Sequence, residues 1–315
     1  MGIQYTRIRF IGSDATCTTN RNLFDKLFSI DKRYGWSDLL DFLYRAEDVE
    51  GLIGTLQYLK QQKRWWDILD LRELCSNTRS IKPLKDVLGS GHWLFNEVAA
   101  KVAIVSLKTD FETYRKTRTK NWRKNISRAY NRVDRLPQVI FGKYTSPSQV
   151  GDIMPAVIDL EKRSWQGSCR IGAFSQNSTR EFHRELAKSL AERGRFVLYT
   201  LESAHKVVCY QYALKYNGQL CLHNIAMDPD FKHYSPGFYL QVRIIEEAFS
   251  EGLKRVVLGR GPEDYKSKLK NAAEDRIWVT VFGTKIVPSV LRYLEFKARP
   301  TLKGLVHSNR TTDKI

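Results

Sequence analysis

From residue 136 onward, the hydrophobic and polar positions of the chain follow two clear periods. Apolar residues that alternate with polar ones predict strands, and apolar residues that recur three or four positions apart predict helices. We expect, in order, a strand at Gln138–Tyr144, helices at Pro147–Trp165 and Ser178–Arg193, strands at Phe196–Glu202, Val207–Tyr216 and Gln219–Met227, a helix at Phe238–Glu251, a strand at Arg255–Leu258, a short helix at Glu263–Asn271 and a strand at Arg276–Phe282.

The three consecutive strands in the middle of this order predict a meander. Asn217-Gly218, between the second and third of them, is the strongest short signal for a hairpin. In the helix that follows, Leu240, Ile244 and Ala248 recur every four residues, so one side of it packs on the sheet. Because this helix joins two strands by a crossover, we expect those strands to be parallel.

The N-terminal third carries weaker signals. We expect strands at Tyr5–Ile11 and Trp65–Leu71, and helices at Trp36–Tyr44 and Val49–Gln62. A basic helix at Phe111–Arg135 links the halves, with a broken apolar stripe among basic and polar residues. We therefore divide the chain into residues 1–135, which end in this linking helix, and residues 136–315, which end in a basic helical tail at Val287–Leu302.

Length and charge narrow the function classes. With 315 residues and 42% hydrophobic content, the chain can form two cores of ordinary size. Its 52 Lys and Arg residues against 34 Asp and Glu give a net charge of +18, which favours anionic partners such as phosphorylated cofactors, nucleic acid or an acidic polymer. The five cysteines are far apart and include no Cys-x-x-Cys pair, so we expect neither a disulfide framework nor a metal site.

The sequence also carries signals of location. Its first residues are too polar for a signal peptide, and no run reaches the roughly 20 apolar residues of a membrane helix. We therefore expect a cytoplasmic protein. Met1-Gly-Ile-Gln-Tyr-Thr6 fits the loose pattern for N-myristoylation, which leaves a peripheral membrane contact open as an alternative.

The segment Asp228–Gly237 joins the third meander strand to the next helix. A Ser235-Pro236-Gly237 turn at this place aims free backbone N–H groups and the positive end of a helix dipole at one point, which suits a phosphate group. Gly237 lets the backbone approach closely, and Ser235 can either cap the helix or bond a phosphate oxygen. The alternative is an ordinary helix start that binds no ligand.

A family resemblance rests on motifs in both halves of the chain. They are Ala226-Met-Asp228, Tyr234-Ser-Pro-Gly237, Leu240, Ile244–Glu246, Gly252 and Gly261-x-Glu-x-Tyr-Lys266, with Val102–Leu107, Phe111-Glu-x-Tyr114, Arg123-Lys-Asn-x-x-Arg128 and Trp65–Leu71. They resemble the CelD/BcsL type of GNAT acetyltransferases, which is related to the FemAB transferases. The resemblance covers most of the chain, and the order of elements resembles that of the GNAT fold.

This resemblance implies an α/β fold class built from tandem GNAT-like units, the first of them reduced. It implies a mixed, mostly antiparallel sheet with one parallel pair of strands that splay apart. The chain departs from the family at Val257, where members usually carry Asp, and at Leu269, where they carry an aromatic residue.

The resemblance also implies which residues bind the donor, acetyl-CoA or another acyl-CoA. They are Ser235, Pro236, Gly237, Phe238 and Tyr239 in the turn and helix, and Ala226 and Met227 in the strand before them. The pantetheine arm would pair with the free edge where residues 220–227 diverge from residues 256–258. The alternative for Ser235 and Pro236 remains the plain helix start.

Acyl transfer to an amine needs proton transfer as well. Tyr265 is our candidate acid, and Glu263 or Asp228 is our candidate base, with Lys266 adjacent to Tyr265. Ordinary packing on a short helix is the alternative for Tyr265 and Lys266. Candidates for acceptor contacts are Arg163, Trp165 and His223, and for Trp165 and His223 a structural role is the alternative.

We therefore expect an acyl-CoA-dependent N- or O-acyltransferase, with acetyl as the expected group. Its acceptor would be a cell-envelope saccharide, lipid or peptide precursor. One alternative is a FemAB-like transferase that takes an aminoacyl group from charged tRNA, which the basic linking helix suits; tRNA is the one nucleic acid that we keep as a partner. Another is a catalytically inactive GNAT-fold binding module, motivated by Val257 and Leu269.

Overall fold

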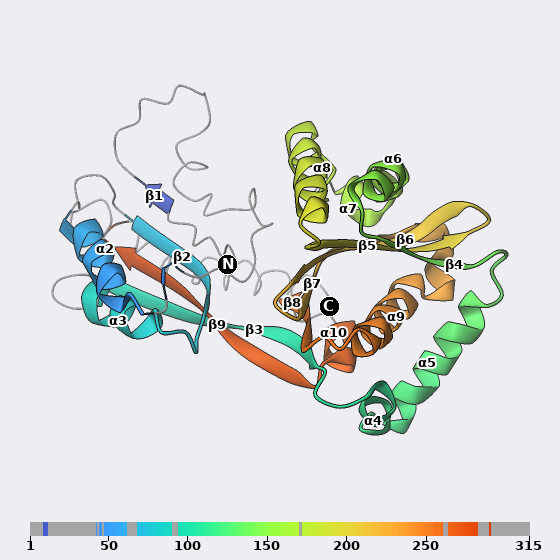
Figure 1. Cartoon of the computed structure of the whole chain (residues 1–315), viewed down its shortest axis with the longest axis horizontal. Coiled ribbons are helices and arrows are strands. Elements are labelled where there is room, and N and C mark those ends of the chain that lie inside the picture. The colour runs from blue at the N-terminus through green and yellow to red at the C-terminus, as the bar shows by residue number, and fades with distance from the viewer. Residues whose placement is uncertain are drawn as a thin grey trace, which may run out of the picture. The chain divides into compact units, whose positions relative to one another are not determined.

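The predicted meander forms part of a mixed sheet (Figure 1). Its strands are β5 (Phe196–Ser203), β6 (Lys206–Tyr216) and β7 (Gln219–Met227), which pair antiparallel. Asn217 and Gly218 both have positive φ, 48° and 72°, as a tight two-residue hairpin turn requires. The hairpin expected at Asn217-Gly218 is confirmed.

Two compact units are recognised in the chain, one of Lys101–Glu274 and one of Ile3–Ala100 with Asp275–Ile315. The computed structural model describes residues 9–11, 42, 44–45, 47–61, 68–89, 94–169, 172–260, 264–282 and 290. The helices expected at 36–44 and 287–302 fall for the most part outside the described residues.

In the unit of Lys101–Glu274, further strands extend the meander on both sides. β4 (Ile140–Tyr144) pairs antiparallel with β5. β8 (Arg255–Arg260) lies parallel to β7, which confirms the parallel pair expected from the crossover. Val102–Ser106, the end of β3 (Leu94–Ser106), pairs antiparallel with β8.

Helices cover both faces of this sheet (Figure 1). α6 (Pro147–Arg163) and α8 (Asn177–Glu192) lie on one face, and α9 (Pro236–Ser250) lies on the other. Leu240, Ile244 and Ala248 of α9 are all buried, as their spacing predicts. The expected start of α8 at Ser178 is one residue late, because the helix begins at Asn177.

The predicted linking helix is two helices, α4 (Phe111–Lys116) and α5 (Lys120–Val133). Side chains of Asp110 and Thr119 cap their first turns, so the chain turns between them. α5 packs its apolar side on α9 within the unit of Lys101–Glu274. The division at residue 135 into two GNAT-like parts stays a prediction.

The other unit has its own sheet segment and core. β2 (Ile68–Cys75) pairs antiparallel with β1 (Arg9–Ile11) and with β9 (Ala272–Phe282). Leucines of α2 (Val49–Gln61) and α3 (Ile81–Leu88) pack with residues of β2 and β9 in one hydrophobic cluster. Within the described residues, no helix combines the length and hydropathy that crossing a bilayer requires.

Candidate active site

Strand β7 contains a bulge where it leaves its neighbour β8. The register between β6 and β7 shifts between Tyr212 and Ala213, which leaves His223 as an extra residue on β7. On its other side, β7 pairs with β8 at Gln219–Cys221 and Arg255–Val257, and among the described residues this pairing goes no further. The two parallel strands therefore part at the bulge.

Beyond the bulge, one edge of β7 faces away from β6. The N–H of Asp228 donates to the C=O of Val208 on β6, at 2.9 Å. Since successive peptide groups of a strand point to opposite sides, the backbone N–H and C=O groups of Ile225 and Met227 point away from β6. The side chain of Gln166 donates from Nε2 to the C=O of Ile225, at 2.6 Å. The family resemblance implies that this edge pairs with the pantetheine arm, whereas no sequence motif points to Gln166.

A 3-10 helix, η1 (Pro229–Tyr234), carries the chain from β7 to α9. Ser235, between the two helices, has left-handed backbone angles, φ 59° and ψ 44°, and its side chain does not cap α9. Pro236 has no N–H and occupies the first helical position, where none is needed. The amides of Gly237 and Phe238 therefore lie in a first turn without a side-chain cap, as an anion site requires.

The first turn of α9 lies against β7. A Cβ atom added at Gly237 would stand 3.7 Å from Cδ1 of Ile225 and 3.8 Å from Sδ of Met227. The uncapped amides are thus close to the strand that carries the free edge. Of the seven residues predicted to bind the donor, Ser235, Gly237, Phe238 and Met227 are partly exposed, whereas Pro236, Tyr239 and Ala226 are buried.

A cation from another helix reaches this turn. Nη1 of Arg132, near the end of α5, donates to Oγ of Ser235 at 3.1 Å. Below it, the ring of Tyr130 packs on that of Tyr239, with 4.8 Å between ring centres, which fixes α5 on α9. The sequence predicts a basic helix here, but Arg132 is not among the predicted site residues. The i, i+4 spacing of Lys120, Lys124, Arg128 and Arg132 is the signal that could have identified it.

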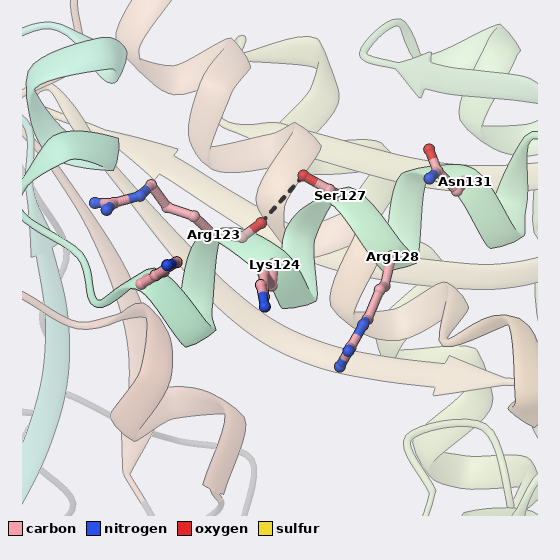
Figure 2. A pocket seen from close by; sticks show the side chains of 6 residues that line it. Arg123, Lys124, Ser127, Arg128 and Asn131 are labelled. Atoms are coloured by element: carbon pink, nitrogen blue, oxygen red, sulfur yellow. Dashed lines mark hydrogen bonds between the residues drawn. The ribbon is translucent and has the colours of Figure 1, made fainter.

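α5 has a cationic side along its length, part of which is seen in Figure 2. A shallow hollow of about 380 Å³ lies along it, lined by Lys120, Arg123, Lys124, Ser127, Arg128 and Asn131. Figure 2 shows Lys124 and Arg128 projecting from the same side of the helix. α5 contains no acidic residue, so nothing within the helix neutralises this side.

Asp228, at the end of β7, is a buried and firmly held carboxylate. It accepts hydrogen bonds from the N–H of Asp230 at 3.1 Å and pairs with Lys206 at 2.8 Å and Arg163 at 3.5 Å. Burial raises its pKa, but the hydrogen bonds and the two cations outweigh burial and hold the pKa below its usual value. Arg163 also pairs with Asp159. The geometry thus favours a structural role for Asp228 and Arg163 over proton transfer and acceptor contact.

Lys266 lies beside the point where β7 and β8 part. It belongs to α10 (Asp264–Leu269) and is buried. A Cβ atom at Gly259 of β8 would stand 3.8 Å from its Nζ and 3.9 Å from the C=O oxygen of Leu222 on β7. Tyr265 is half-buried, and its ring centre is 5.8 Å from Nζ of Lys266. Glu263, the other candidate base, lies outside the described residues.

His223 points to the face of the sheet that α8 covers. Its ring is 6.0 Å from that of His183 on α8 and 5.8 Å from that of Tyr212. Burial lowers the pKa of both histidines to about 4, and in His183 the charge of His223 adds to the effect. Trp165, the remaining acceptor candidate, lies on α7 (Trp165–Ser168) and is 59% exposed.

This pair predicts that the protein loses stability as the pH falls from about 6.5 to about 4. Below the unfolded pKa of 6.5 the unfolded chain binds protons at both histidines, whereas the folded protein resists them down to about 4. Urea midpoints measured across this range should fall less steeply for His183→Phe than for the wild type. His205→Asn, in an exposed turn, is the control and should follow the wild type. An equally steep profile for His183→Phe would contradict the prediction.

The buried carboxylate of Glu161 connects α6 to the bulged strand β7 by hydrogen bonds. Glu161 is not among the site residues predicted from the sequence. Oε2 of Glu161 accepts from the hydroxyl of Tyr210 at 2.5 Å and from Nδ2 of Asn224 at 2.8 Å, and Oε1 accepts from the N–H of Phe174 at 2.6 Å. Burial and this carboxylate together hold the pKa of Tyr210 well above its usual value. The sequence does carry a signal for this buried position, because Glu161 lies at helical spacing from the apolar residues Met154 and Val157 and so shares their side of α6.

Val257 and Leu269, the two positions that differ from the CelD/BcsL pattern, lie in the core. Val257 is the last residue of the parallel pairing with β7 and is buried. Leu269 is fully buried, and its C=O accepts from the hydroxyl of Tyr114 at 2.6 Å. Both positions are filled by apolar side chains. In the part of the chain that the structure describes, no cluster of three or more His, Cys, Asp or Glu residues could hold a metal ion.

Comparison with known proteins identifies the fold. Residues 120–267 match the family described as "Acetyltransferase (GNAT) domain". No curated protein matches the sequence. Among solved structures, FemX matches over 91% of this chain and 90% of its own, with 9% identity and a TM-score of 0.55.

Two further structures match most of the chain. The C-terminal domain of a protein named as a lysylphosphatidylglycerol synthetase, from Agrobacterium fabrum, covers 79% of this chain and 77% of its own, with 11% identity and a TM-score of 0.56. L-PGS from Bacillus licheniformis covers 76% of this chain and 74% of its own, with 13% identity and a TM-score of 0.52. The expected α/β GNAT fold is confirmed, and the CelD/BcsL type stays a prediction.

Proposed function

We propose that this protein is a GNAT-type acyltransferase that takes an acyl group, acetyl in the first instance, from acyl-CoA. Its acceptor is an amine or hydroxyl of a cell-envelope saccharide, lipid or peptide precursor. The observation that carries the proposal is the uncapped first turn of α9, which lies against β7 at the point where β7 and β8 part. The GNAT acetyltransferase match over residues 120–267 supports it.

The pyrophosphate of the donor would bind at this turn. The amides of Gly237 and Phe238 and the positive end of the α9 dipole suit an anion. Arg132 adds a guanidinium held at 3.1 Å from Ser235, and guanidinium groups bind phosphate oxygens well. Phosphate binding therefore draws on two helices, α9 for the amides and α5 for the cation.

The acyl-bearing arm would follow the free edge of β7. The N–H and C=O groups of Ile225 and Met227 point away from β6 and can pair with the amides of an extended pantetheine chain. A backbone N–H of this edge would then stabilise the oxyanion that develops on the thioester carbonyl, a contact of about 3 kcal/mol in acyl transfer.

Transfer forms a bond from the acceptor nitrogen or oxygen to the acyl carbon and breaks the bond from that carbon to sulfur. The acceptor loses a proton, and the departing thiolate gains one, for which Tyr265 is the proposed acid. Glu263 remains the proposed base, since the carboxylate of Asp228 is held by Lys206 and Arg163. Lys266 supplies positive charge where the two strands part, and so favours the oxyanion or the thiolate.

Calorimetric titration with acetyl-CoA tests the proposal. We expect a dissociation constant in the low micromolar range, because this donor combines phosphate contacts with pairing along a strand. A chain that binds neither acetyl-CoA nor coenzyme A would rule out the proposed donor. Titration with uncharged and charged tRNA under the same conditions provides the contrast.

A second candidate is transfer of an aminoacyl group from tRNA. The cationic side of α5 favours it, because Lys120 to Arg132 spans about 18 Å of helix, more than the phosphates of one coenzyme A would occupy. The likeness of the fold to FemX over 91% of this chain is consistent with the FemAB-like alternative. If tRNA binds with a steep salt dependence and acetyl-CoA does not bind, this candidate replaces the first.

A further inference from the structure

The short helix α7 reaches from α6 to the free edge of β7 by one side chain. Oε1 of Gln166 accepts from the hydroxyl of Ser164 at 2.9 Å, which orients the amide. Its Nε2 then donates to the C=O of Ile225 at 2.6 Å. The side-chain amide of Gln166 therefore bonds a backbone group that belongs to the proposed donor site.

The chemistry of this contact matches that of the donor. A pantetheine arm that pairs with β7 presents amide N–H groups to strand carbonyls, and Ile225 offers one of the carbonyls that point away from β6. The Nε2–H of Gln166 is the same kind of donor and approaches the same acceptor. An extended arm and the Gln166 side chain thus compete for one position on the strand.

Few buried contacts hold α7 in place. The donor can therefore take the position on β7 by displacing this helix together with Gln166. The helix has only four residues, Trp165–Ser168, and none of them is buried. Trp165 is 59% exposed. Segments with few buried contacts open at low free-energy cost, whereas the neighbouring Ser164 is fully buried and provides a fixed point.

We propose that Gln166 is a gate on the donor site: its side-chain amide occupies the pantetheine position on β7, and donor binding displaces it together with α7. This inference rests on the proposed acyl-CoA function. The displacement places Trp165 on the segment that moves.

Calorimetric titration of coenzyme A into Gln166 variants tests the gate. Gln166→Ala removes the competing hydrogen bond, so the dissociation constant should fall about five-fold, the factor expected for one neutral hydrogen bond. Gln166→Leu keeps the size of the side chain but cannot donate a hydrogen bond. If its dissociation constant falls as far as that of Gln166→Ala, the hydrogen bond of Gln166 opposes the donor; if it falls less, the size of the side chain contributes. Both results are consistent with a gate. Gln176→Ala, on a side chain that does not cap α8, is the matched control and should not change affinity.

The other outcomes are distinct. Weaker binding in Gln166→Ala would make Gln166 a ligand of the donor and overturn the gate, and so would an unchanged affinity. If neither the wild type nor any variant binds coenzyme A, the proposed donor fails and the gate fails with it. If coenzyme A binds only once Gln166 is replaced, both proposals are supported.

Fluorescence gives a second measure of the displacement. Coenzyme A should change the tryptophan emission of the wild type, and this change should be absent from Trp165→Phe, because Trp165 moves with α7. If Trp165→Phe binds coenzyme A and shows the same change as the wild type, α7 does not move and the gate is wrong.

Discussion

Replacing Gly237 with Trp should weaken acetyl-CoA binding by about 100-fold or more while the protein stays folded. The uncapped amides of α9 would each make a charge-assisted bond to phosphate, and losing two such bonds costs about 3 kcal/mol. A Cβ atom at Gly237 meets only ordinary contacts, 3.7 Å to Ile225 and 3.8 Å to Met227. Because a Cβ atom fits there, the backbone of the turn need not shift, and the indole beyond it should take space that the donor needs, so binding and not folding should be lost.

Two control variants test whether the loss of acetyl-CoA binding is specific to a large side chain at position 237. Gly151→Trp places the same side chain on the exposed side of α6, where an added Cβ has no neighbour within 4 Å, and should bind acetyl-CoA like the wild type. Gly237→Ala should reduce binding only slightly, because a methyl group leaves the amides accessible. Calorimetry measures all three variants, and undiminished binding in Gly237→Trp would place the phosphate elsewhere.

Replacing Glu161 with Ala should lower the free energy of unfolding by about 3 kcal/mol or more. The change leaves the Tyr210 hydroxyl, the Asn224 amide and the Phe174 N–H without the carboxylate that accepts from them, and orphaned buried donors are costly. It also leaves a cavity among α6, β6 and β7. Urea unfolding followed by circular dichroism gives the free energy.

Glu185→Ala, on the exposed side of α8, is the matched control and should change stability by less than about 0.5 kcal/mol. Glu161→Gln keeps the shape of the side chain and one acceptor oxygen. Its loss of unfolding free energy should therefore lie between those of Glu161→Ala and Glu185→Ala. A loss below about 1 kcal/mol for Glu161→Ala would mean that the buried network contributes little beyond its hydrophobic surroundings.

Local sequence patterns are enough to predict the strands and the helix that position the candidate site. The alternation in residues 196–227, the Asn217-Gly218 turn and the spacing of Leu240, Ile244 and Ala248 are local signals, and each predicted its element correctly. The parallel pairing of β7 with β8 is expected because a helix joins the two strands by a crossover, which is a general constraint. Physical rules that act over a few residues therefore determine where the turn and the free edge lie.

Contacts between distant residues could not be predicted in this way. Arg132 and Ser235 are 103 positions apart, and Gln166 and Ile225 are 59 apart, so no local period connects them. The bulge at His223 depends on how β6 and β7 align, because alternation alone does not show where one extra residue enters. The sequence patterns also do not predict strand β3 or helix α3, although the Val102–Leu107 segment at the end of β3 is part of the family resemblance.

The extra residue in β7 has a consequence for how the strand tolerates length changes. Leu222 packs in the core beneath α9, His223 and Asn224 both point to the opposite face, and Ile225 returns to the α9 face. Because His223 and Asn224 face the same side, removing His223 would leave Leu222, Asn224 and Ile225 in regular alternation, whereas removing a residue from a regular part of β7 would exchange the faces of the residues that follow. Natural variants of this protein should therefore tolerate a one-residue deletion at position 223 better than one elsewhere in β7.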